Sequence, residues 1–165
     1  LASTAWALAA LRCLDAPLLD AISSQSLSRI TEFNPEGLCA TAWSFAALGY
    51  ADAPLFDAIA ASSLRRIIAA SFGAAELAGT AWSFSTRPVR HTPLLDAIAA
   101  AALRKMPDFD QQGLSNTSWA FAALSLPDAP LMDSIAEAAI PKISQAQAQH
   151  VSSLAWAYAA LCVLH

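Results

Sequence analysis

The sequence predicts an all-α protein, an α-solenoid of stacked helical hairpins with a repeat of about 37 residues. Three observations support this fold class. Ala and Leu dominate a chain of 165 residues that is 56% hydrophobic and holds only 5 glycines, a composition that favours helices over strands. Tryptophan recurs at intervals of 37, 39, 37 and 37 residues. A second motif, a proline followed by two apolar residues and an aspartate, recurs with the same spacing.

These two motifs anchor every copy of the repeat. The tryptophans are Trp6, Trp43, Trp82, Trp119 and Trp156, and the proline motif begins at Pro17, Pro54, Pro93 and Pro130. Together they predict a single helical-repeat array over 1–165. Its four complete units are 1–37, 38–76, 77–113 and 114–150, and a partial fifth unit is 151–165. We expect the array to be a piece of a longer protein.

Each unit is predicted to form two helices, and the second copy shows why. Asn34 is a good N-cap, Pro35 suits the first helical position, and Gly49 suits the position after the last turn. Asp52 and Pro54 open the second helix in a similar way. Because one short hairpin cannot cover its own apolar sides, neighbouring copies are expected to stack against each other.

The third unit departs from this pattern at the joint between its helices. Arg87-Pro88 replaces the Leu-Gly end of the first helix, and Arg90-His91-Thr92 replaces the Asp-Ala cap of the second. Two extra residues fall between Ile67 and Phe72, where a longer turn would absorb them. We expect the joint of the third unit to be the least regular in the array.

The sequence carries no catalytic or metal-binding motif. It lacks a Gly-rich phosphate loop, an H-E-x-x-H pattern and a G-x-S-x-G pattern. Cys13, Cys39 and Cys162 are far apart and are interpreted as ordinary buried thiols. No apolar run approaches the roughly 18 residues that a membrane span needs. We therefore predict that the protein is not an enzyme, needs no cofactor or metal, binds no small-molecule substrate and does not enter a membrane.

Two recurring columns allow both a structural and a functional interpretation. The aspartates of the proline motif are interpreted as dipole-complementing or inter-repeat groups, because a catalytic site would be unique and not repeated. This column comprises Asp20, Asp57, Asp96 and Asp133. The tryptophans could stack on nucleobases, but residues that recur in every copy more often hold repeats together. Packing is therefore the favoured interpretation of the tryptophans.

Positions that differ between copies are the candidates for specific binding. On the first helix of each unit, small or polar residues lie opposite the apolar face, where they would let a ligand approach closely. A tightly packed face explains them equally well. The candidates are Ala40, Gly79, Asn116 and Ser153, followed one turn later by Ser44 and Ser83, with Ala120 and Ala157 in the equivalent places.

A basic column recurs near the end of the second helix of each unit. It comprises Arg29, Arg66, Lys105 and Lys142. One cation per unit could follow an RNA backbone, or it could complement the negative end of the helix dipole; both interpretations stay open. The net charge of −4 and a pI near 5.1 lower the expectation of nucleic-acid binding, which usually comes with a basic footprint.

One segment resembles a known family of helical repeats. Residues 33–49, FNPEGLCATAWSFAALG, resemble the motif FNxxxLANxxWAxAxLG of octotricopeptide repeats, whose units of 37 to 38 residues are similar to those of the FAST-kinase-like proteins. The spacing from leucine to tryptophan holds in all five copies if Val151 stands for leucine. The asparagine of the motif is present at Asn116 and is replaced by Ala40, Gly79 and Ser153 in other copies.

The resemblance implies RNA binding in an organelle, the mitochondrion or alternatively the chloroplast, in RNA processing, stability or translation control. The first hypothesis is that the variable first-helix positions and the basic column bind single-stranded RNA. The alternative is a protein–protein interaction scaffold that uses the same surface. Salt dependence separates the two, because binding through phosphates weakens steeply as salt rises.

Overall fold

Every regular element of the structure is helical. The computed structural model describes residues 1–86 and 91–162, and within these ranges it contains nine α-helices, three short 3-10 helices and no strand. The α-helices are α1 (Ala2–Ala10), α2 (Ala16–Ser28), α3 (Pro35–Ala47), α4 (Ala53–Ile68), α5 (Ala74–Ser85), α6 (Thr92–Lys105), α7 (Gln111–Ala123), α8 (Ala129–Ala139) and α9 (Ala148–Cys162). The 3-10 helices are η1 (Ile30–Glu32), η2 (Met106–Asp108) and η3 (Ile140–Gln145). The prediction of an all-α fold is confirmed.

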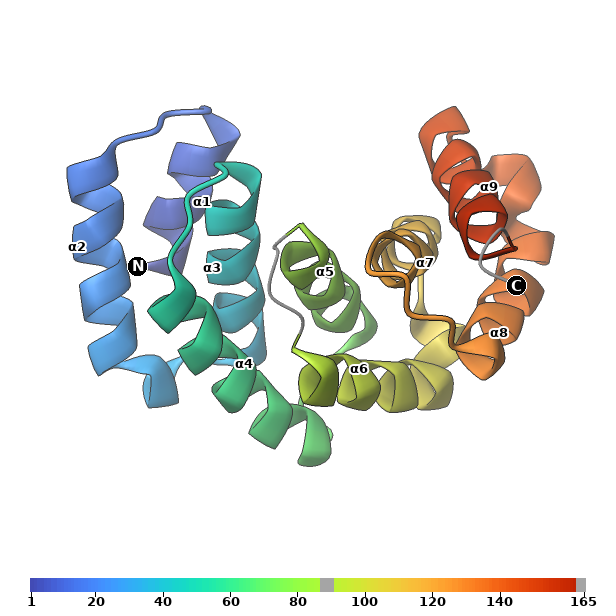
Figure 1. Cartoon of the computed structure of the whole chain (residues 1–165), viewed down its shortest axis with the longest axis horizontal. Coiled ribbons are helices and arrows are strands. Elements are labelled where there is room, and N and C mark those ends of the chain that lie inside the picture. Colours follow the sequence, from blue (N-terminus) through green and yellow to red (C-terminus); the bar gives the residue numbers. More distant parts are fainter. Residues whose placement is uncertain (87–90, 163–165) are drawn as a thin grey trace.

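The helices form two rows along an arc (Figure 1). The odd-numbered helices lie on the inner side, and each packs against the next from α1 to α9. The even-numbered helices α2, α4, α6 and α8 lie on the outer side and contact each other less closely. Because one row packs more tightly than the other, the chain curves toward the odd-numbered helices.

Local side-chain chemistry explains where most helices begin. Five N-cap side chains accept a hydrogen bond from the backbone N–H three residues later, at 2.7–3.1 Å. These caps are Asp15, Asn34, Asp52, Asp110 and Asp128. The predicted caps at Asn34 and Asp52 are confirmed. In the third unit, α6 begins after His91 without a side-chain cap, as the loss of the aspartate from this copy predicts.

A residue in the left-handed region ends three of the inner helices at the same place in the repeat. The φ angles are 52° at Arg12 after α1, 67° at Gly49 after α3 and 52° at Ser125 after α7. In each case the following N–H donates to the carbonyl five residues back, at 2.9–3.0 Å, which is the Schellman arrangement. The predicted role of Gly49 is confirmed, and two residues with side chains adopt the same conformation.

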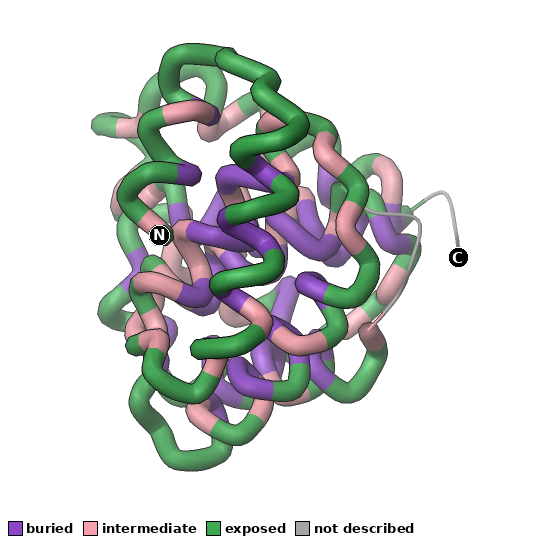
Figure 2. Tube along the Cα trace, turned by 90° about the vertical axis from the view of Figure 1, so that its left-hand side faces the viewer, coloured by how far each residue is buried: buried purple, intermediate pink, exposed green. Residues whose placement is uncertain are grey.

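The apolar core lies between the two rows, and helices of both rows contribute to it. Figure 2 shows the buried positions inside the molecule with exposed positions around them. The fully buried residues include Leu38, Leu77 and Leu114 from the inner helices and Ile59, Ile98 and Ile135 from the outer helices. Each such side chain contributes about 1.5–3 kcal/mol through burial, so both rows stabilise the chain.

Two predictions about irregular places have different outcomes. Residues 87–90, which include the predicted Arg87-Pro88 and Arg90 departures, lie outside the described residues. The two extra residues of the second interval lengthen α4 to Ile68 and add a turn through Ala70, whose φ is 59°. This turn takes the place of the 3-10 helix that follows α2, α6 and α8.

The prediction of three buried thiols is wrong for two of them. Cys13 and Cys162 are exposed, whereas Cys39 is partly buried. Cys13 lies in the turn after α1, which ends at Ala10, and not in a helix. Within the described residues, no helix combines the length and the apolar character that crossing a membrane requires.

Candidate binding face on the inner helices

The five tryptophans form a row along the inner helices, one per helix, which we call the tryptophan row. Trp43 and Trp82 have ring centroids 6.2 Å apart, and Trp119 and Trp156 have ring centroids 5.9 Å apart. The interplanar angles are 33° and 31°. These contacts between neighbouring copies agree with the packing interpretation. The indoles are not buried, however, because Trp6 is 54% exposed and Trp156 is 47% exposed.

The small residues one turn after the candidate positions belong to the helix interface and not to an open surface. The side chains of Ser44 and Ser83 are completely buried. Their hydroxyls donate to the carbonyl oxygens of Ala40 and Gly79, at 2.6 and 2.7 Å. Ala120 and Ala157 are equally buried. Of the two interpretations that the sequence left open for these positions, the tightly packed face is the one that agrees with this burial, because the small side chains let the inner helices pack closely on each other.

The candidate positions one turn earlier lie nearer the surface. Ala40, Gly79, Asn116 and Ser153 are all partly exposed, and each precedes a residue of the tryptophan row by three positions. Gly79 also supports helix packing, because a Cβ there would come 2.6 Å from the Sγ atom of Cys39. Asn116 is the member of this group whose side chain can form directional hydrogen bonds with a ligand from both an amide oxygen and an amide nitrogen.

The basic column is largely engaged in structural contacts. A guanidinium nitrogen of Arg66 donates to the carbonyl oxygen of Thr31 at 2.9 Å, and the ammonium of Lys142 donates to the carbonyl oxygen of Phe109 at 2.6 Å. Both bonds reach back to the preceding copy. Arg29 is exposed and pairs with Glu32 at 2.7 Å. Lys105 is partly exposed.

Besides Arg12 in the turn after α1, two cations outside the basic column are open to solvent. Arg65 and Arg104 lie one position before the column members Arg66 and Lys105, and both are exposed. Neither forms an ion pair within the described residues. The pairs of adjacent cations at 65–66 and 104–105 were the available signal in the sequence, and in the first pair only Arg66 is used for a contact with the preceding copy.

Charge is distributed unevenly along the inner helices. Within their described residues, α1, α3, α5, α7 and α9 contain no Lys or Arg. Glu36 and Glu76 lie on α3 and α5, whereas α7 and α9 carry amide and hydroxyl groups and no carboxylate. We call α1, α3 and α5 the acidic half of the face and α7 and α9 the neutral half, since α7 and α9 carry no charged Asp, Glu, Lys or Arg between their caps.

The acidic half contains a pocket of about 340 Å³ between α1, α3 and α5. Its lining combines two indoles, two carboxylates and smaller side chains: Trp6, Glu36, Cys39, Ala40, Trp43, Ala75 and Glu76. Burial raises the pKa of the Cys39 thiol to about 11, and the negative charges of Glu76 and Glu36 add to the rise. The thiol is therefore protonated near neutral pH.

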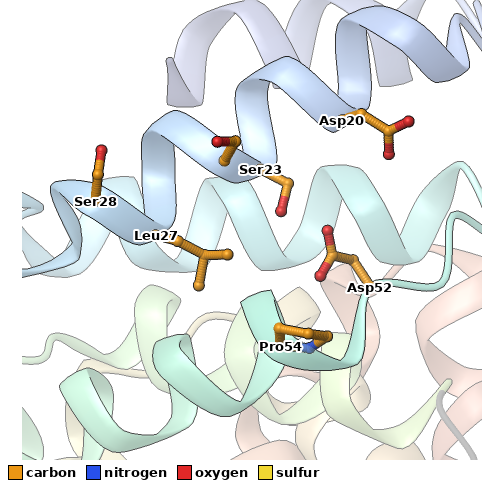
Figure 3. A pocket seen from close by; sticks show the side chains of 7 residues that line it. Asp20, Ser23, Leu27, Ser28, Asp52 and Pro54 are labelled. Atoms are coloured by element: carbon orange, nitrogen blue, oxygen red, sulfur yellow. The ribbon is translucent and has the colours of Figure 1, made fainter.

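A second, larger groove of about 630 Å³ lies between the outer helices α2 and α4. Figure 3 shows Asp20, Ser23 and Leu27 on α2 pointing toward Asp52 and Pro54 at the start of α4. Both carboxylates already have structural partners. Asp20 accepts a hydrogen bond from the Tyr50 hydroxyl at 2.6 Å, and Asp52 caps α4. The groove follows from the loose packing of the outer row.

Two members of the aspartate column, Asp20 and Asp57, form contacts between copies, as the structural interpretation of this column predicts. Asp20 bonds to Tyr50, as described above, and Asp57 lies 3.2 Å from the Nε2 atom of His91. Each contact joins two copies of the repeat. Among the described residues, no group of three or more His, Cys, Asp or Glu side chains is arranged to hold a metal ion.

One comparison bears on the family of this all-helical chain. The family model of the RNA-editing substrate-binding complex 6 protein matches residues 1–165. The chain belongs to this family. No curated protein matches the sequence closely enough to serve as a relative.

Membership of the RNA-editing substrate-binding complex 6 family confirms part of the sequence interpretation. The prediction of a family of RNA-associated helical proteins is correct at that level. The matched family is not named for octotricopeptide repeats or FAST-kinase-like proteins. By its name the family belongs to an RNA-editing substrate-binding complex, so the predicted link to RNA processing holds for the family.

Proposed function

We propose that this chain is an α-solenoid of about 37-residue helical hairpins that binds single-stranded RNA within an RNA-editing substrate-binding complex. The family match supports the link to such a complex. The recurrence of the caps, the tryptophans and the left-handed helix ends supports the repeat. On this proposal the chain is a binding module and not an enzyme, and it acts in the mitochondrion, with the chloroplast as the alternative.

The observation that carries RNA binding is the neutral half of the tryptophan row. The ring centroids of Trp119 and Trp156 lie 5.9 Å apart, and Trp156 is 47% exposed. Asn116 lies one turn before Trp119, and Ser153 lies one turn before Trp156. Exposed aromatic rings stack on unpaired bases, and neighbouring amides and hydroxyls form hydrogen bonds with base edges.

Phosphate contacts have a smaller part in this proposal than base stacking. Arg66 and Lys142 are engaged by backbone carbonyls, so the cations left for an RNA backbone are chiefly the exposed Arg65 and Arg104. Few neutralised phosphates mean a weak electrostatic contribution to affinity. We therefore propose that stacking supplies most of the binding free energy.

The test is fluorescence anisotropy with an end-labelled, mixed-sequence single-stranded RNA. Trp156→Ala should weaken binding by about 5- to 150-fold, because stacking contributes about 1–3 kcal/mol per base. Asn116→Ala should weaken it less. The matched control is Trp6→Ala, which removes an equally exposed indole from the acidic half and should leave RNA affinity unchanged. If Trp156→Ala folds normally by circular dichroism and binds RNA with undiminished affinity, the proposal is wrong.

The alternative function, a protein–protein interaction scaffold, is favoured by a different observation. The inner helices carry no Lys or Arg within the described residues, and the net charge of the chain is −4. An acidic inner face attracts basic protein segments and repels phosphates. Because the proposed RNA binding relies mainly on stacking, salt dependence does not separate it from such a scaffold, and the RNA affinity of Trp156→Ala is the measurement that distinguishes the two.

A further inference from the structure

One repeated position of the inner helices carries a negative charge in the N-terminal half of the face and a neutral glutamine in the C-terminal half. Seven residues before each tryptophan, on the same side of the helix two turns earlier, the chain has Glu36, Ala75, Gln112 and Gln149 in successive copies. Only the first of these is charged. The glutamines are close in shape to Glu36, so the chain itself contains an uncharged version of the same arrangement.

The pocket at this end joins aromatic faces to negative charge. Trp6 and Trp43 line it from α1 and α3, and Glu36 and Glu76 line it from α3 and α5. Trp6 is more than half exposed, and Glu36 is exposed as well. One oxygen of Glu76 accepts a hydrogen bond from the Gly73 N–H at 3.0 Å. The charge of Glu36 is therefore the one more open to a ligand.

No positive side chain of the inner helices neutralises this pocket. Within their described residues, the five inner helices lack Lys and Arg. The negative potential reaches the pocket lining, because the charges of Glu76 and Glu36 contribute to the raised pKa of Cys39 after the larger effect of burial. A phosphate group would be repelled here, whereas a cation would be attracted by both the carboxylates and the indole faces.

We propose that this pocket binds an arginine side chain presented by a basic segment of a partner protein. The planar guanidinium can stack on an indole of Trp6 or Trp43 while its N–H groups donate to the Glu36 carboxylate. A volume of about 340 Å³ accommodates one such side chain with its apolar stem against Ala40 and Ala75. The proposal goes beyond RNA binding and concerns the opposite half of the tryptophan row.

The experiment follows the indole N–H signals of the five tryptophans by NMR in the ¹⁵N-labelled chain. The probe is a short peptide with one central arginine, and its control is the same peptide with citrulline, which keeps the shape and lacks the charge. The arginine peptide should shift the Trp6 and Trp43 signals in a saturable way and leave those of Trp119 and Trp156 in place. The citrulline peptide should bind about 2- to 30-fold more weakly, as expected from loss of the cation–π contribution.

A pair of matched variants exchanges the charge between the two halves. Glu36→Gln gives α3 the side chain that α7 already has at Gln112, and it should weaken binding of the arginine peptide at Trp6 and Trp43 several-fold. Gln112→Glu should create an arginine-dependent shift at Trp119. Both positions are solvent-exposed, so neither change is expected to disturb folding, which circular dichroism verifies.

Three outcomes would overturn the proposal. They are equal shifts of all five indoles, equal binding of the arginine and citrulline peptides, and Glu36→Gln binding the arginine peptide as well as the unchanged chain. Single-stranded RNA that shifts Trp6 and Trp43 in place of the arginine peptide would assign the pocket to RNA. The RNA test relies on Trp156 and Asn116, so either proposal can fail while the other stands.

Discussion

Gly79 of α5 lies against Cys39 of α3, so closely that a Cβ at Gly79 would come 2.6 Å from the cysteine Sγ. The two residues belong to neighbouring copies and stand at the point where the inner helices pack on each other. A separation this short leaves no room for a methyl group unless the thiol turns to another rotamer. The absence of a side chain at Gly79 therefore helps set the spacing of the inner row.

Gly79→Ala is expected to destabilise the chain by about 1 kcal/mol. Alanine gains up to about 1 kcal/mol of helix propensity over glycine, but overpacking of a close contact costs about 1–3 kcal/mol. Urea unfolding followed by circular dichroism measures the difference. Adding Cys39→Ala to this variant should restore the lost stability, and a Gly79→Ala chain more stable than the original would contradict the contact.

Lys142 is expected to stabilise the fold more than it serves a ligand. Its ammonium donates to the Phe109 carbonyl at 2.6 Å, and the Lys142 carbonyl accepts from the Gln111 side chain at 2.8 Å. Lys142→Met should reduce the free energy of unfolding by about 1–2 kcal/mol, since a hydrogen bond to a charged group contributes about 1.5–3 kcal/mol. The control is Arg104→Met, an exposed cation that should change stability by less than about 0.5 kcal/mol. Equal effects of the two substitutions would refute the structural role.

Features that depend on neighbours in the sequence could be predicted, and contacts between copies could not. The caps at Asn34 and Asp52 join residues three positions apart, so the local sequence contains both partners. The contact between Arg66 and Thr31 spans 35 residues, and the sequence around neither residue indicates that the other is its partner. The basic column therefore looked equally suited to RNA and to the helix dipole.

The sequence left the burial of the small residues undecided for a related reason. Ser44 and Ser83 are polar, and polar residues opposite an apolar stripe normally face water. Their hydroxyls instead donate to carbonyls one turn earlier within the same helix, which removes the cost of burial. Because inner helices such as α3 and α5 pack tightly on two neighbours, two faces of the same helix are buried. The apolar pattern of one helix indicates the first of these faces and not the second, which is lined by small residues.

The three thiols are expected to differ sharply in reactivity. Cys13 and Cys162 are exposed, whereas burial raises the pKa of Cys39 to about 11. Because the thiolate is the reactive form and only about 0.1% of a thiol with a pKa near 11 is ionised at pH 8, Cys39 should react more slowly with a disulfide reagent than the two exposed thiols. Raising the pH toward 10 should accelerate the slow phase. Cys39→Ala should remove that phase, and three equal rates would contradict the burial of the thiol.

RNA affinity is expected to depend only weakly on salt. Each neutralised phosphate of a single strand contributes a slope of about −0.7 to a plot of log K against log salt. Two available cations, Arg65 and Arg104, therefore predict a slope of about −1.4. Replacing both with Gln should flatten the plot, whereas Trp156→Ala should lower affinity at every salt concentration and leave the slope unchanged. A steep slope that survives the double substitution would mean that other cations bind the backbone.

Substitutions at the left-handed helix ends are expected to change the stability of the chain in opposite directions, depending on whether glycine is introduced or removed. Arg12 and Ser125 adopt φ of 52° where Gly49 adopts 67°, and a residue with a Cβ pays about 1 kcal/mol or more in this region. Arg12→Gly and Ser125→Gly should therefore each stabilise the chain by about 1 kcal/mol, less a small loss from the greater freedom of glycine in the unfolded state. Gly49→Ser should destabilise it by a similar amount, because nothing lies within 4 Å of a Cβ at Gly49 and backbone strain is the main change in the folded state. The three midpoints of urea unfolding measure this directly, and a shift of the same sign in all three variants would show that these positions are not equivalent ends of one repeated helix.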